Sequence, residues 1–180
     1  MNELGYEHTN KKIISILVPC YNEEVVLNQF YQRLSQVITN IPQYDFQFMF
    51  INDGSKNRTL DIMRELHEKD SRVSYVNLSR NFGKEIAMIA GIDYLTGDAA
   101  IIMDADLQDP PELIPEMISW WEKGYQDVSA SGAAGQGSRS LRSGRPMPFI
   151  RFCRRCPVYP CSAMSAISAY WTNSASMLCA

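Results

Sequence analysis

Long apolar runs and a basic surplus are both missing from this sequence of 180 residues. The longest apolar stretches, near residues 13–19 and 99–103, have the length of strands, whereas a membrane-spanning helix needs about 18 or more apolar residues. The net charge of −3 argues against nucleic-acid binding, which usually requires a clear basic surplus. Residues 1–12 also lack the basic start and apolar core of a secretory signal, so we expect a cytosolic chain without a transmembrane helix.

Acidic residues are absent from the last part of the chain. All 20 Asp and Glu lie before residue 128, whereas the remaining stretch holds six Arg, no Lys and four of the five Cys. A composition shift of this size marks a boundary, and residues 129–137 have the Ser, Gly and Ala content of a flexible linker. We therefore expect an N-terminal arm at 1–11, one domain at 12–128, and an atypical tail rich in Ser, Ala, Arg and Cys at 129–180, either disordered or frameshifted.

Within residues 12–128, short apolar runs alternate with longer stretches of helical periodicity. This alternation is typical of βαβ units, so we predict an α/β fold with a mainly parallel sheet and helices on both faces. Helix-end signals are Asn22 as an N-cap, and Gly97 and Gly124 as C-terminal caps. The predicted strands span 13–18, 46–51, 73–78 and 99–103, with a fifth beginning at 125–128, and the predicted helices span 27–41, 60–66 and beyond, 84–95 and 111–123.

Each of the four predicted strands runs directly into a polar, turn-forming cluster. Right-handed crossovers bring the carboxyl ends of parallel strands to one edge of the sheet, where open α/β sheets bind their ligands. The clusters are therefore expected to converge on one site. They lie at residues 21–24, 52–55, 80–84 and 104–109.

The last cluster contains two carboxylates in a D-x-D arrangement. Asp104 and Asp106 alternate at a strand end, so both can face the same cleft while the residue between them turns away. A hard cation such as Mg²⁺ or Mn²⁺ would relieve their repulsion, and Gln108 and Asp109 could add oxygen ligands. The alternative is that one Asp caps the next helix and the other is merely solvated.

The other clusters contain groups suited to a nucleotide. Asp53 could accept hydrogen bonds from a base or ribose, and Lys84 at a helix start could bind a diphosphate. A nucleoside could stack on Tyr21 and bond to the carboxylate of Glu23. The simpler alternatives are a tight turn at Asp53 and a solvated Lys84. Cys20 is expected to be a small buried residue rather than a nucleophile.

Two common nucleotide-binding signatures are absent. No G-x-G-x-x-G follows the first predicted strand, and no G-x-x-x-x-G-K-[ST] occurs, so the simplest dinucleotide and P-loop interpretations are excluded. Phosphatases with a D-x-D nucleophile place that pair after the first strand. Here it follows the fourth.

Together the four clusters resemble those of family 2 inverting glycosyltransferases of the A fold. The resemblance covers about residues 12–128, and the R-N-F-G-K and D-A-D-L-Q-D-P forms are most similar to polyprenyl-phosphate sugar transferases. These include bactoprenol (undecaprenyl-phosphate) glucosyltransferases and, more distantly, dolichol-phosphate mannose synthases. The stretches that carry the resemblance are 16–24, 50–55, 79–84 and 103–112.

The resemblance implies a hexose transfer with inversion from a UDP-sugar, expected to be UDP-glucose, to a polyprenyl phosphate at the cytoplasmic membrane face. It implies Mg²⁺ or Mn²⁺ as the cofactor. Asp104 and Asp106 would hold the metal and diphosphate, Gln108 the metal, and Asp109 would at most aid catalysis. The nucleoside-binding set would comprise Pro19, Tyr21, Asn22, Glu23 and Asp53, and Lys84 would complete the donor site.

The chain departs from that family after Val128. The expected Arg-containing acceptor loop, amphipathic helix and membrane helices are not recognisable, which suggests a shift in reading frame and a truncated protein. Two hypotheses therefore stand beside an active transferase: a catalytically silent fragment that retains at most nucleotide and metal binding, and a nucleotidyltransferase on a similar fold. Cys153, Cys156 and Cys161 lack the second Cys pair or His that a metal site would need.

Overall fold

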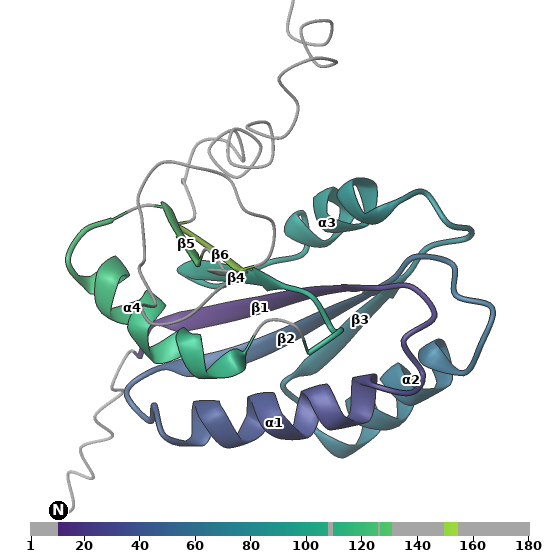
Figure 1. Ribbon diagram of the computed structural model, residues 1–180, viewed down its shortest axis with the longest axis horizontal. Coiled ribbons are helices and arrows are strands. Elements are labelled where there is room, and N and C mark those ends of the chain that lie inside the picture. Colours follow the sequence, from purple (N-terminus) through teal and green to yellow (C-terminus); the bar gives the residue numbers. More distant parts are fainter. Residues whose placement is uncertain (1–10, 108–109, 126, 131–149, 155–180) are drawn as a thin grey trace, which may run out of the picture.

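The computed structural model describes residues 11–107, 110–125, 127–130 and 150–154, which form a sheet with helices on both of its faces (Figure 1). The strand order is β3-β2-β1-β4-β6-β5. The first four strands are parallel, and β6 is antiparallel to both β4 and β5. The strands are β1 (Ile13–Cys20), β2 (Asp45–Asn52), β3 (Val73–Asn77), β4 (Ala99–Met103), β5 (Asp127–Ala130) and β6 (Ile150–Arg154).

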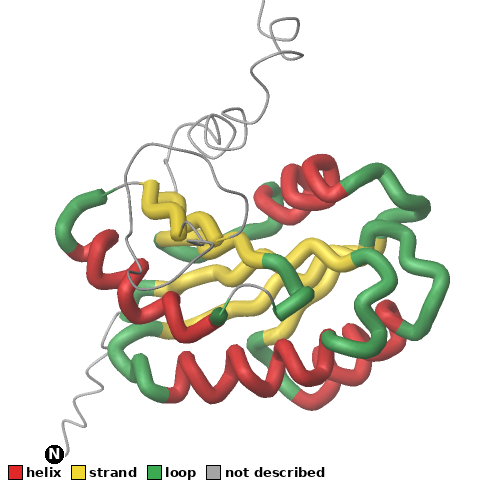
Figure 2. The backbone as a smooth tube through the Cα atoms, viewed as in Figure 1, coloured by secondary structure: helices red, strands yellow, loops and turns green. Residues whose placement is uncertain are grey.

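The helices lie unequally on the two faces of this sheet. Figure 2 shows α1, α2 and α4 on one side of the strands and α3 on the other. This arrangement confirms the predicted α/β class with helices on both faces. The helices are α1 (Leu27–Thr39), α2 (Thr59–Lys69), α3 (Lys84–Ile92), the 3-10 turn η1 (Pro111–Leu113) and α4 (Ile114–Glu122).

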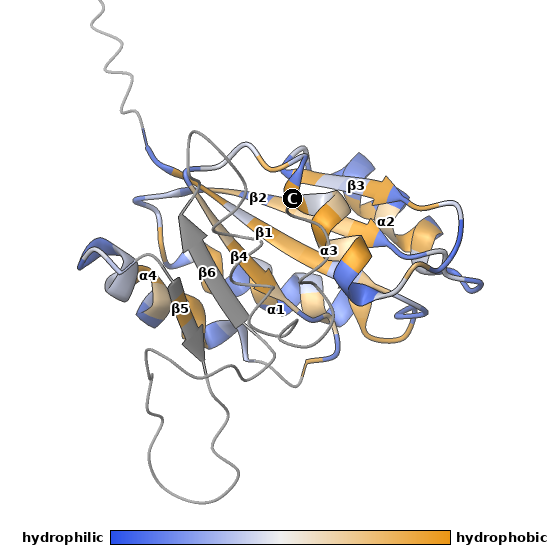
Figure 3. Ribbon diagram, turned by 90° about the horizontal axis from the view of Figure 1, so that it is seen from above, coloured by the Kyte–Doolittle hydropathy of each residue, from blue (hydrophilic) through white to orange (hydrophobic). Residues whose placement is uncertain are grey.

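Strand β1 lies inside the sheet and divides the core in two. Its residues from Ile14 to Cys20 are all buried, as expected for a parallel strand covered on both faces. Ile14, Ile16 and Val18 face the larger core with α1, α2 and α4, whereas Leu17 joins the smaller core beneath α3. In Figure 3, β1 and α3 are largely orange, the colour of hydrophobic residues. Alternation of side chains along β1 thus places successive residues in one core and then the other.

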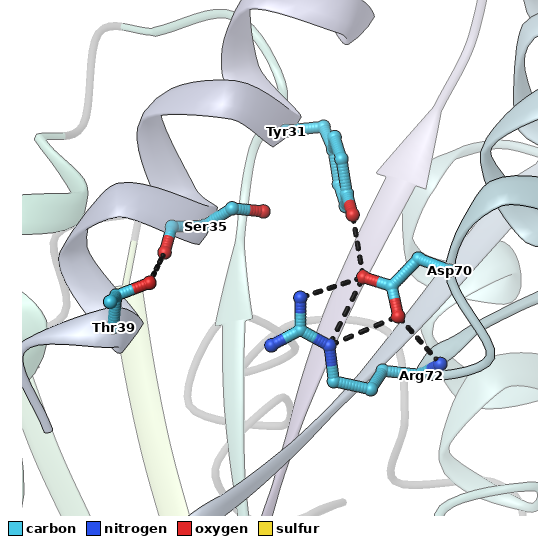
Figure 4. A network of polar contacts seen from close by, with 5 residues as sticks. All are labelled: Tyr31, Ser35, Thr39, Asp70 and Arg72. Carbon is cyan, nitrogen blue, oxygen red and sulfur yellow. Dashed lines mark hydrogen bonds and ion pairs between the residues drawn. The ribbon is translucent and has the colours of Figure 1, made fainter. Parts of the chain in front are cut away.

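A polar network connects α1 with the residues that precede β3 (Figure 4). The hydroxyl of Tyr31 on α1 donates to Asp70 Oδ2 at 2.5 Å, and the Arg72 guanidinium donates to both oxygens of that carboxylate. The Arg72 hydrogen bonds lower the pKa of Asp70 to about 2. This network ties α1 to the turn between α2 and β3.

Two of the predicted helix ends are wrong. Helix α1 begins at Leu27, as in the predicted range of 27–41, but ends at Thr39, and its N-cap is Val26 rather than Asn22 and makes no side-chain capping hydrogen bond. Asn22 instead has a φ of 60° and bonds to another loop. Helix α3 ends at Ile92, three residues before the predicted end, because the backbone N–H of Leu95 donates to Ile92 in a tighter turn. Gly124, with a φ of 94°, does follow the end of α4.

The sheet continues past residue 128, where the sequence predicted a boundary. Residues 129–130 belong to β5, and β6 pairs Arg151 with Ile102 and Phe152 with Ile101 of β4. Residues 1–10 of the predicted arm at 1–11 and the rest of the predicted tail lie outside the described residues, so the domain boundaries stay predictions. Cys156 and Cys161 also lie outside them. Among the helices in the described ranges, none is long and apolar enough to span a bilayer.

Candidate donor site

The loops that follow β1 and β2 are held together by hydrogen bonds in both directions. The backbone N–H of Asn22 donates to Ser55 Oγ at 2.9 Å, and the backbone N–H of Lys56 donates to Asn22 Oδ1 at 2.9 Å. Two residues further along both loops, the backbone N–H of Arg58 donates to Glu24 Oε2 at 2.9 Å. Asn22 therefore shapes the edge of the sheet through its left-handed backbone and its amide oxygen.

The loop after β2 is joined in turn to the loop after β3. The carboxylate of Asp53 is 3% exposed and accepts backbone N–H groups from Phe82 at 2.7 Å and Gly83 at 2.9 Å. Gly54 has a φ of 64°, and a Cβ added there would lie 2.3 Å from the carbonyl carbon of Arg80. The chain passes so close at this point that only glycine fits.

The loop after β3 reaches the loop after β4 through an ion pair. Lys84, the first residue of α3, places its Nζ 2.5 Å from Asp104 Oδ2. The Asp104 side chain is 15% exposed and that of Lys84 is 41% exposed. The sequence alternative of a merely solvated Lys84 is thus wrong, because its ammonium has a defined carboxylate partner.

Two further carboxylates, those of Glu23 and Asp106, lie near that ion pair. Burial raises the pKa of Glu23, and the negative charges of Asp106 and Asp104 raise it further. Burial also raises the pKa of Asp104, against the opposing effect of Lys84. Ala105, between the two aspartates, is 2% exposed and packs into the core, as the alternation predicted. The clusters after β1, β3 and β4 therefore do meet.

The remaining nucleoside-binding candidates differ in accessibility. Tyr21 is 42% exposed beside the site, whereas Pro19 is buried within β1 opposite Ile51. Cys20 is 2% exposed, which confirms the prediction of a small buried residue, and burial raises the pKa of its thiol. Gln108 and Asp109 lie outside the described residues.

The carboxylate cluster suits a cation that is only partly held by protein. Across the described ranges, no three His, Cys, Asp or Glu side chains are grouped as a complete metal centre. Mg²⁺ and Mn²⁺, however, are commonly held by one or two carboxylates and by substrate phosphates. The mutual repulsion at Glu23, Asp104 and Asp106 is what such a cation would relieve, so the residues present fit it.

Sequence reasoning missed contacts that support the site. Asn52, 1% exposed, donates from its amide nitrogen to Asn77 Oδ1 at 2.6 Å, and its own amide oxygen accepts the Ser55 backbone N–H. The guanidinium of Arg80 lies 4.4 Å from the ring centre of Phe82. The only signal available was the position of Asn52 and Arg80 in the clusters at the strand ends, and Asn77 comes from another strand.

With this geometry established, comparison with known proteins identifies the family. The model of the family described as Glycosyl transferase family 2 matches residues 15–165. The chain belongs to glycosyl transferase family 2. The family match begins in β1 and continues beyond β6, so it includes all four strand-end clusters.

Curated relatives in this glycosyltransferase family are similar over most of the chain. An uncharacterized glycosyltransferase of Bacillus subtilis, YkcC, is 45% identical over 137 residues, which are 76% of this chain and 42% of the relative. The bactoprenol glucosyl transferase of Shigella phage SfX is 44% identical over 117 residues, or 65% of this chain and 38% of the relative. The chain thus spans less than half the length of these relatives.

Solved structures share the glycosyltransferase fold. A mannosyltransferase from Pyrobaculum calidifontis, in complex with GDP-Man and Mn²⁺, has a TM-score of 0.59 at 19% identity, covering 69% of this chain and 37% of its own. Glucosyl-3-phosphoglycerate synthase from Mycobacterium tuberculosis, in complex with Mn²⁺, UDP-Glc and phosphoglyceric acid, has a TM-score of 0.53 at 21% identity and covers 71% and 46%. At these identities the likeness concerns the fold.

Proposed function

We propose that this glycosyltransferase transfers glucose, with inversion, from UDP-glucose to a polyprenyl phosphate. The observation that carries the proposal is the meeting of Glu23, Asp104 and Asp106 with Lys84 at the carboxyl ends of parallel strands. The site lies by β1, whose neighbours β2 and β4 are on opposite sides, and ligands bind at such switch points. The 44% identity to a bactoprenol glucosyl transferase supports the choice of donor and lipid acceptor.

The donor site divides into a nucleoside part and a diphosphate part. The exposed ring of Tyr21 offers a surface for stacking, and Glu23 offers a carboxylate beside it. Pro19, Asn22 and Asp53 belong to the same part through the strand end and loops that they shape. Lys84 would bind the diphosphate. Asp104, Asp106 and Gln108 would hold Mg²⁺ or Mn²⁺.

The proposed reaction needs little help from a general base. A lipid phosphate monoester has a second pKa of roughly 6, so the acceptor is already anionic at neutral pH. Its oxygen attacks C1 of the sugar, the bond from C1 to the diphosphate oxygen breaks, and UDP leaves with the electron pair. The bound cation would supply neutralisation of charge on the departing diphosphate. Asp109 is assigned at most an auxiliary catalytic part.

The acceptor also sets where the reaction would take place. A polyprenyl phosphate is anchored in a bilayer, so transfer would occur at its cytoplasmic surface, where UDP-sugars are available. We therefore propose that the protein contacts a membrane surface through its acceptor. The proposed reaction involves no nucleic acid.

The test is transfer of label from radioactive UDP-glucose to undecaprenyl phosphate in the presence of Mn²⁺. We expect lipid-linked label with the wild-type chain and none with Asp106→Asn, after circular dichroism has shown that both are folded. GDP-mannose as the donor should give no product. Binding of UDP without lipid-linked label would instead identify a silent donor-binding chain, and release of inorganic diphosphate would identify a nucleotidyltransferase.

A further inference from the structure

The loop after β4 contains a bulky residue in a backbone conformation that bulky residues avoid. Leu107 has a φ of 61°, in the left-handed region, and it directly follows Asp106 of the proposed metal site. Among the described residues other than glycine, Asn22 alone shares a positive φ with it. Asparagine tolerates this conformation, whereas leucine adopts it only where the surrounding structure holds it there. Contacts around Leu107 must therefore offset the strain.

The side chain of Leu107 packs against the larger core. Ala105, which is 2% exposed, belongs to the same core. Asp104 and Asp106 alternate with these two residues in the sequence, so the loop turns its apolar groups to the core and its carboxylates to the site. Removal of apolar surface from water stabilises the folded loop. Burial of Leu107 is thus the contribution that opposes the strain in its backbone.

The far end of the loop is fixed as well. Pro111 is buried at the start of η1. From α1, the Nε and Nη2 atoms of Arg33 donate to the two carboxylate oxygens of Glu112 at 2.8 and 2.9 Å. Such a paired arrangement fixes orientation as well as distance. Because β4 holds one end of the loop and this anchor holds the other, the path between them depends on the turn after Asp106.

A strained turn beside metal ligands can prepare a site before its ligand arrives. A cation binds more tightly where its carboxylates are already in place, since no free energy is then spent on ordering the loop. We infer that Leu107 is a positioning residue for the metal: its packed side chain holds the left-handed turn that keeps Asp106 close to Asp104 and Glu23. The inference rests on the proposed metal site and adds a residue whose side chain has no ligand atom.

The test compares two leucines that pack against the same core. Leu113 is also partly buried against the larger core, but its φ is −79° and it lies beyond the loop, at the end of η1. Each leucine is changed to Ala and to Gly in the full chain, and Leu107→Met keeps an apolar side chain of similar volume. Circular dichroism shows whether each variant is folded, and electron paramagnetic resonance of the free ion measures Mn²⁺ binding.

Mn²⁺ affinity is the first measurement. We expect Leu107→Ala and Leu107→Gly to bind Mn²⁺ roughly 10-fold more weakly than the wild type, as is typical when a residue that supports a metal ligand is lost. Leu107→Met should stay close to the wild type. Leu113→Ala should also bind as the wild type does, because it loses packing without disturbing the turn. Unchanged binding in Leu107→Ala, or equal weakening in Leu113→Ala, overturns the inference.

Thermal melts without metal are the second measurement. Leu107→Gly should melt roughly 2–4 °C above Leu107→Ala, because glycine adopts a positive φ without strain. At position 113 the order should be reversed, since alanine is favoured over glycine in a helical turn. The same order at both positions would show that the turn at Leu107 is not strained, and the inference would fail.

Asp106→Asn separates this inference from the proposed function. If Asp106→Asn binds Mn²⁺ as tightly as the wild type, the proposed metal site fails and the inference fails with it. If Asp106→Asn loses Mn²⁺ binding while Leu107→Ala retains it, the metal site stands and only the role of Leu107 is wrong.

Discussion

Asp53 and Gly83 lie 30 residues apart, yet the backbone N–H of Gly83 donates to Asp53 Oδ2 at 2.9 Å, beside a matching bond from Phe82 to Oδ1. Both oxygens of a carboxylate that is 3% exposed thus have backbone donors. Asp53 fixes the start of α3, and through it the position of Lys84. This contact suggests a positioning role in addition to the nucleoside role that the sequence predicted.

Asp53→Asn should therefore destabilise the protein. Asparagine keeps one acceptor oxygen but turns an N–H₂ donor toward the second backbone N–H, which leaves buried donors facing each other. We expect a loss of roughly 1–3 kcal/mol in the free energy of unfolding, measured by urea denaturation. Asp61→Asn, on the exposed side of α2, is the control and should change stability by at most about 0.5 kcal/mol. Unchanged stability with weaker UDP binding would favour direct nucleoside contact.

Gly54→Ala should destabilise the protein more than Gly124→Ala does. Both glycines have positive φ values, 64° and 94°, so both substitutions strain the backbone. Only at Gly54 would the new Cβ collide with backbone, at 2.3 Å from the carbonyl carbon of Arg80, whereas nothing lies within 4 Å at Gly124. Strain alone costs roughly 1–2 kcal/mol, and the collision should add to it. Equal decreases in Tm for the two variants would show that the loops after β2 and β3 move apart easily.

The Asp70 network should make stability depend on pH in the acidic range. Hydrogen bonds from Arg72 lower the pKa of Asp70 from 3.8 to about 2, so the native state favours the carboxylate. The stabilisation is present above about pH 4 and is lost as the pH falls through about 2. It amounts to roughly 2 kcal/mol at neutral pH.

Chemical denaturation of the wild type and Asp70→Asn between pH 7 and pH 2 measures this effect. The difference between their unfolding free energies should shrink steadily below about pH 4, because only the wild type loses the carboxylate. A difference that stays constant down to pH 2 would contradict the assigned shift.

Metal and nucleotide should stabilise the chain together. A ligand at 100 times its dissociation constant adds about 2.7 kcal/mol, which corresponds to a rise in Tm of roughly 5 °C or more for a domain of this size. We expect that rise with Mn²⁺ and UDP, its reversal by EDTA, and its absence in Asp106→Asn. If UDP raised the Tm equally in the presence of EDTA, the proposed donor site would not need a metal ion.

The sequence could predict most of the sheet because its signals are local. Apolar runs such as residues 13–18 and 99–103 predict strands, and β1 and β4 contain them. The ends of helices were less predictable. Asn22 has the residue type of an N-cap, but its amide oxygen is taken by the Lys56 backbone, and that competing partner lies on another strand's loop.

The pairing of β6 with β4 could likewise not be predicted from the periodicity of apolar residues in the sequence. Residues 150–154 carry no strong alternating pattern, and their place in the sheet follows from antiparallel pairing with both β4 and β5. The partners of β6 lie far away in the sequence. Its position in the sheet therefore depends on its register with β4 and on the edge that β4 offers for pairing, more than on its own residues.

The sequence by itself determined the α/β class, the four polar clusters at the strand ends and the family. These depend on residue types at short spacings. Tertiary structure alone decided which groups within those clusters meet: Asp53 with the amides before α3, Lys84 with Asp104, and Glu23 with the two aspartates. Strand order and register set those distances, and the distances decide which charges are paired.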